Sequence, residues 1–120
     1  MSIKKQEPNM PAAIPTELAA MIDYQEGSVV SRTLQQDEIG TLTVFSFDQG
    51  QGLSEHTSPF NAYVQILDGQ AEITIGGKSV TVQAGQLILM PGGVPHQLDA
   101  VQRFKMLLTL FRTQAQTAGR

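Results

Sequence analysis

The alternation of apolar and polar positions marks most of this chain as β-structure. After residue 28, short apolar runs rich in Val, Ile, Thr and Phe are separated by turns rich in Gly, Pro and Asp. The alternation is clearest where Ala71, Ile73 and Ile75 flank Glu72 and Thr74. No long helical pattern intervenes between the runs, so the sequence predicts an all-β domain, built as a sandwich or a closed barrel.

Turn signals divide this region into short strands. The dipeptides Asp68-Gly69 and Gly76-Gly77 each predict a tight hairpin turn. The run Leu87–Met90 is apolar on both faces, so we expect it to be buried on both sides, with its second face covered by a partner subunit or the N-terminal arm. The predicted strands are Val29–Leu34, Thr41–Phe47, Asn61–Leu67, Ala71–Ile75, Val80–Val82, Leu87–Met90, His96–Ala100 and Phe104–Phe111.

The N-terminal segment has a different pattern. It begins with a polar stretch punctuated by prolines, which is typical of an arm. Thr16 is placed to cap a short helix in which Leu18, Met21 and Ile22 share one face, and Gly27 would end it. The chain therefore divides into an arm with a short helix, a barrel and a polar tail, at residues 1–27, 28–112 and 113–120.

Composition narrows the range of functions. The net charge is −3 and no basic cluster is present, which argues against a nucleic-acid partner. The chain has no cysteine, so zinc ribbons, iron–sulfur clusters and thiol nucleophiles are excluded. No apolar stretch has the roughly 20 residues of a membrane helix. The first residues lack the apolar segment of a secretory signal, so we expect a cytoplasmic protein.

Both histidines lie in a segment framed by glycines and prolines. With Gly50, His56 and Gly69 in matching positions, this segment resembles the first motif of a small single-domain cupin. Ser58 stands where that motif has its second histidine, and Ala62 stands where it has a glutamate.

The second cupin motif is also matched. Gly85, Pro91, Gly93 and His96 fit its spacing, while Ala100 replaces its asparagine. The resemblance implies a cupin barrel, also called a double-stranded β-helix or jelly roll. It also implies that His56 and His96 converge at one point inside the barrel.

The resemblance leaves the metal site incomplete. Open catalytic sites typically use three protein ligands, and here only His56 and His96 remain, because Ala62 can bind nothing. A divalent transition metal (Zn, Ni, Fe, Mn or Cu) is therefore only a candidate cofactor. A second hypothesis is a metal-free site in which one histidine acts as a general base, as in cupin sugar epimerases, with Tyr63 and either Asp48 or Asp99 as the only candidate partners. A third is that both histidines are hydrogen-bonded remnants.

We predict a small-molecule-binding cupin of unassigned ligand with a degraded metal site. The alternative is a metal-dependent cupin enzyme, an oxygenase or isomerase, that uses a two-histidine centre. A purely structural or regulatory dimer is a third class. We expect a homodimer and assign no catalytic residue. The residues expected to contact the ligand are His56, Ser58, Phe60, His96 and Met106.

Overall fold

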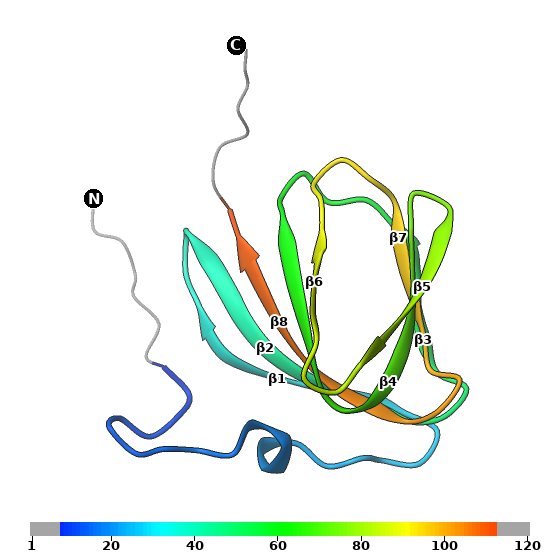
Figure 1. The fold of residues 1–120 in the computed structure, drawn as a ribbon. Coiled ribbons are helices and arrows are strands. Elements are labelled where there is room, and N and C mark those ends of the chain that lie inside the picture. Colours follow the sequence, from blue (N-terminus) through cyan, green and yellow to red (C-terminus); the bar gives the residue numbers. More distant parts are fainter. Residues whose placement is uncertain (1–7, 113–120) are drawn as a thin grey trace.

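The computed structural model describes residues 8–112 and is built almost entirely of antiparallel strands (Figure 1). This confirms the all-β prediction. One short 3-10 helix, η1 (Leu18–Met21), precedes the sheet. The strands are β1 (Val29–Gln36), β2 (Gly40–Phe47), β3 (Gly52–His56), β4 (Ala62–Ile75), β5 (Lys78–Gln83), β6 (Leu87–Met90), β7 (His96–Asp99) and β8 (Phe104–Phe111).

The strands curl into a barrel with two walls (Figure 1). One wall has the order β1-β2-β8-β4-β6, and the other is formed by β3, β7, β5 and the second half of β4. Inward-facing side chains from both walls fill the core, where Phe47 stacks on Phe104 with ring centroids 4.4 Å apart. The alternation seen in the sequence is thus the inward and outward alternation of these strands.

Strand β4 runs through the position where a hairpin was predicted, so the prediction of a turn at Asp68-Gly69 is wrong. The strand passes from one wall to the other there, and its pairing with β8 shifts register between Ile66 and Asp68. Gly69 has φ +74°, and a Cβ on it would overlap the carbonyl oxygen of Arg103. Glycine is therefore needed for a bulge against β8 rather than for a turn. The second predicted hairpin, Gly76-Gly77 between β4 and β5, is confirmed.

The helix is shorter than predicted. Thr16 does not cap it, because its hydroxyl donates to the carbonyl of Ile14, and the helix ends at Met21 rather than at Gly27. Its apolar side chains instead help the arm to cover the outer face of β1 and β2, where Leu34 and Val44 are buried. Since η1 has only four residues, none of the helices in residues 8–112 could span a membrane.

Strand β6 is not buried on both sides within one chain. Met90 faces the core and is 3% exposed, but Leu87 and Leu89 point outward and are 63% and 42% exposed. The arm does not cover them, because it packs on the outer face of β1, β2 and β8, away from β6. The prediction that the N-terminal arm buries the outer face of β6 is therefore wrong. Burial of this face by a partner subunit stays a prediction.

Candidate functional site

The two histidines come together at one end of the barrel. His56 ends β3 and His96 begins β7, and these strands pair so that the two residues are directly opposite each other. Their Nε2 atoms are 3.1 Å apart, and the rings meet edge to face. The predicted convergence of the two rings is confirmed. We call His56 and His96 the histidine pair.

The two rings differ in their surroundings. His96 is 4% exposed, whereas His56 is exposed, so the pair is open to solvent from the His56 side. Burial lowers the pKa of His96 because the charged ring is poorly solvated there. The hydrogen bond to the Val94 carbonyl works in the opposite direction, and the charge of a protonated His56 adds to the lowering. His96 therefore favours the neutral form.

The contacts of the ring nitrogens determine which nitrogen of each neutral ring carries the hydrogen. Nδ1 of His56 lies 2.8 Å from the carbonyl oxygen of Ser54, and Nδ1 of His96 lies 3.3 Å from that of Val94. A carbonyl only accepts hydrogen bonds, so the shorter contact assigns the hydrogen of His56 to Nδ1 and leaves its Nε2 as an acceptor. The hydrogen bond between the two Nε2 atoms then requires a hydrogen on Nε2 of His96, which donates to His56. The histidine pair therefore holds one donor and one acceptor.

Two loops hold this end of the barrel together. The loop after β3 contains Ser58, whose carbonyl accepts a hydrogen bond of 2.8 Å from Gly93 N–H in the loop before β7. In the same two loops, Gly92 N–H donates to the side chain of Asn61 at 2.9 Å. A Cβ on Gly92 would overlap the backbone of Pro59. These contacts fix the positions of both histidine-bearing segments.

A small cavity of about 80 Å³ lies beneath the histidine pair. Its walls are almost wholly apolar, and the polar side chains that line it are those of His56, Ser58 and His96. Met106 also lines it, but Phe60 does not, and the Phe60 N–H donates to Ser58 Oγ instead. The lining residues are Leu53, His56, Ser58, Ala62, Met90, His96, Leu98, Met106, Leu108 and Leu110.

Neither the acid nor the tyrosine suggested for a general-base site reaches this cavity. Tyr63 packs against Phe111, Asp48 accepts a hydrogen bond from Gly27 N–H, and Asp99 accepts one from Gln97. None of the three lines the cavity. Among residues 8–112, no carboxylate or phenol therefore lines the cavity beside the histidine pair to orient a catalytic base.

The donor set fits a complete metal site poorly. The two Nε2 atoms converge, as two ligands of one ion would, but Ala62 adds only a methyl group to the cavity wall. Within residues 8–112, no group of three or more His, Cys, Asp or Glu side chains could hold a metal ion. A transition metal would need water or a bound molecule for its remaining ligands.

The sequence did not reveal most of the cavity wall. Strand β3 was not predicted, because Leu53 is its only apolar side chain and gives no alternation to detect. Leu98, Leu108 and Leu110 lie in predicted strands, but alternation alone does not tell which inward residues border an empty space.

Comparison with known proteins gives one consistent result. The family model described as Cupin domain matches residues 43–110. A conserved protein of unknown function from Streptococcus pyogenes is 41% identical, with a TM-score of 0.84 over 96% of this chain and 98% of its own. A cupin 2 conserved barrel domain protein from Leptotrichia buccalis is 36% identical, with a TM-score of 0.77, over 78% of this chain and 46% of its own.

A cupin superfamily protein from Desulfitobacterium hafniense is 28% identical, with a TM-score of 0.81 over 92% of this chain and 98% of its own. Among curated proteins, none matches the chain. These three structures agree on the barrel, and the names of the three proteins state no ligand or reaction.

Proposed function

Because the chain belongs to the cupin family, we propose that it binds a small molecule in the barrel cavity, over the histidine pair, without a metal of its own. The observation that carries this proposal is the polarity of the cavity. Its walls are apolar, and its polar side chains gather at one end. Such a site favours a molecule with an apolar body and one polar group.

The polar group is expected to both donate and accept hydrogen bonds, as a hydroxyl does. The neutral histidine pair offers an acceptor on His56 Nε2 and a donor on His96 Nε2, and the Ser58 hydroxyl already accepts from Phe60 N–H. The residues lining the cavity include no lysine or arginine, so a carboxylate or phosphate ligand would have no cation to pair with. The expected ligand class is therefore an uncharged molecule with an O–H or N–H group.

A metal-dependent enzyme, an oxygenase or isomerase, is the second candidate. It is supported by the convergence of the two Nε2 atoms at 3.1 Å. His56 and His96 would hold the ion, which would act as a Lewis acid toward a bound oxygen atom. The missing third ligand weighs against this candidate, since two neutral imidazoles do not offset the charge of a divalent ion in an apolar cavity.

Metal content and ligand binding together distinguish the two candidates. Protein dialysed against a chelator would be analysed for bound metal and then screened by ligand-observed NMR with small uncharged alcohols and amides. We expect no bound metal, and we expect ligand binding that is lost in His96→Phe but kept in Val101→Ser, which alters an exposed residue outside the cavity and outside β6. One tightly held metal per chain after dialysis, with binding only when it is present, would favour the enzyme instead.

The exposed face of β6 supports a further part of the proposal, a homodimer. Leu87 and Leu89 pair in register with Gln65 and Tyr63 on β4, so this part of the outer wall has no charged side chain. A second copy would cover both leucines. In light scattering we expect the mass of two chains, reduced to one chain by Leu89→Glu but not by Val101→Glu, which alters another exposed apolar residue. A single-chain mass for the unaltered protein would contradict the dimer.

A further inference from the structure

The cavity beneath the histidine pair is small enough to limit the size of its ligand. Its volume is about 80 Å³, about half that of an engineered apolar cavity of roughly 150 Å³ that accepts one benzene molecule. Benzene has six carbon atoms, so this cavity has room for about three. The part of the ligand that lies inside the barrel is therefore very short.

The cavity is closed on the side away from the histidine pair. Met90, Leu98 and Met106 line it there, and all three are buried, whereas His56 is exposed to solvent. A ligand whose hydroxyl contacts the histidine pair thus points its apolar part toward these buried side chains. A longer apolar part meets packed side chains instead of empty space.

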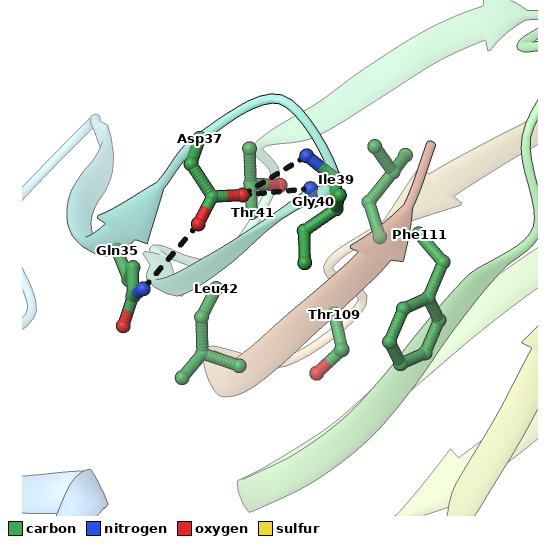
Figure 2. A pocket seen from close by; sticks show the side chains of 9 residues that line it. Gln35, Asp37, Ile39, Gly40, Thr41, Leu42, Thr109 and Phe111 are labelled. Carbon is green, nitrogen blue, oxygen red and sulfur yellow. Dashed lines mark hydrogen bonds between the residues drawn. The ribbon is translucent and has the colours of Figure 1, made fainter. Parts of the chain in front are cut away.

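A larger hollow, of about 170 Å³, does not extend the cavity (Figure 2). We call it the outer hollow. Thr109 and Phe111 of β8 border it, and they alternate along the strand with Leu108 and Leu110, which line the cavity. Successive side chains of a strand point to opposite faces of the sheet, so the outer hollow lies on the outer face of the wall. The sheet therefore separates the two spaces.

Ala62 determines how much of the cavity is empty. On β4 it pairs with Met90 of β6 and with Leu110 of β8, so it lies in the middle of a row of cavity residues. Its methyl group is buried, and the residues paired with it occupy both sides. A larger side chain at this position could therefore extend only into the cavity, where it would take the place of ligand atoms.

We propose that the ligand is a compact, uncharged hydroxyl compound with about three carbon atoms inside the barrel, and that Ala62 sets this size limit. This inference rests on the function proposed above and names the ligand class more closely. The closed cavity and the central position of Ala62 support the size limit. The absence of lysine and arginine from the lining supports the lack of charge.

Three linear alcohols test the size limit: methanol, propan-1-ol and hexan-1-ol. Each methylene transferred from water to an apolar site raises affinity about fourfold, so in unlimited space hexan-1-ol would bind about 60-fold more tightly than propan-1-ol. We expect propan-1-ol to bind on the order of tenfold more tightly than methanol, and hexan-1-ol to gain less than about fivefold over propan-1-ol. Affinities would be measured by titration, followed through the ring signals of His56 and His96.

Two variants of the cavity should move the limit in opposite directions. Ala62→Val should weaken propan-1-ol about tenfold and leave methanol within about twofold. Leu108→Ala removes most of a leucine side chain from the lining, so hexan-1-ol should now bind about tenfold more tightly than propan-1-ol. Ile39→Ser, in the outer hollow, is the matched control and should change no affinity. Unfolding midpoints would check that each variant folds.

The outcomes separate this inference from the proposed function. A gain of more than about fivefold for hexan-1-ol in the unaltered protein would overturn the size limit. Undiminished binding of propan-1-ol by folded Ala62→Val would overturn the role of Ala62. Should Ala62→Val not fold, Leu108→Ala decides, and an unchanged preference in that variant would overturn the inference. If no alcohol affects the histidine rings, the proposed function itself fails.

Discussion

Each of the two histidine-bearing segments positions one histidine at the same end of the barrel, but the two segments match the cupin motifs to different extents. The segment Gly85–His96 keeps its glycines, proline and histidine, and its histidine is buried. The segment Gly50–Gly69 keeps its glycines and histidine, but Ser58 and Ala62 replace the other two ligands, and His56 is exposed. The glycines are required by the backbone, whereas the ligand positions serve only the chemistry. The replacements at the two ligand positions are therefore compatible with an intact fold.

Restoring the first segment should produce the largest effect. In the double variant Ser58→His with Ala62→Glu, all four ligand positions of the motif are occupied, and the carboxylate offsets the charge of the ion. We expect zinc or nickel affinity to rise on the order of 1000-fold, measured by calorimetric titration. In Ser58→Asn with Ala62→Gln, which matches the size but lacks the imidazole and the charge, the gain should be much smaller. An equal gain in both variants would show that the ligands do not converge.

The glycines of the first segment should differ strongly from each other. Gly69 and Gly50 both have positive φ, 74° and 88°, but a Cβ on Gly69 would overlap the Arg103 carbonyl whereas one on Gly50 meets open space. Strain alone costs about 1 kcal/mol, and a backbone overlap adds about 2 kcal/mol. Urea unfolding should therefore show a loss of about 3 kcal/mol for Gly69→Ala and about 1 kcal/mol for Gly50→Ala. Similar losses would mean that the bulge in β4 is not tightly packed.

The histidines should contribute unequally to stability. His96→Ala removes a buried ring and leaves a hole beside the cavity, so we expect a loss of about 2 kcal/mol in the free energy of unfolding. His56→Ala alters an exposed residue and should cost less than about 0.5 kcal/mol. Equal losses, measured by urea unfolding, would show that both rings are equally enclosed.

The pH dependence of stability should come mainly from the second segment. Burial holds the pKa of His96 in the folded state below its ordinary value of 6.5. As pH falls below 6.5, the unfolded chain therefore takes up a proton more readily than the folded one, and the free energy of unfolding decreases. This contribution is fully present above that pH and is lost as pH falls through the folded-state pKa.

Urea unfolding between pH 7 and 5 would measure the effect, with pH values chosen around the ordinary histidine pKa of about 6.5. The slope of the free energy of unfolding against pH should flatten in His96→Gln, and most of it should remain in His56→Gln. An unchanged slope in His96→Gln would rule out His96 as its source.

The sequence predicted features that depend on local chemistry. The turn at Gly76-Gly77 and the strand Phe104–Phe111 needed only neighbouring residues, and the motif spacing placed both histidines correctly. Asp68-Gly69 was misread because the same dipeptide can serve a hairpin or a bulge, and the deciding contact is with Arg103, which is distant in sequence.

The exposure of the site could not be predicted for the same reason. The exposure of His56 depends on how the loops before β4 and before β7 pack against each other, and these loops are distant in sequence.

The most direct test of a metal-free ligand site uses the ring nitrogens of the histidine pair. Nitrogen NMR of chelator-treated protein, labelled at histidine, reports the tautomer of each ring and the effect of added propan-1-ol. We expect neutral His56 to carry its hydrogen on Nδ1 and neutral His96 to carry it on Nε2, and we expect the alcohol to shift both Nε2 signals at saturating concentration without any metal. Signals that do not move, or that move only after zinc or another divalent ion is added, would contradict the proposed function.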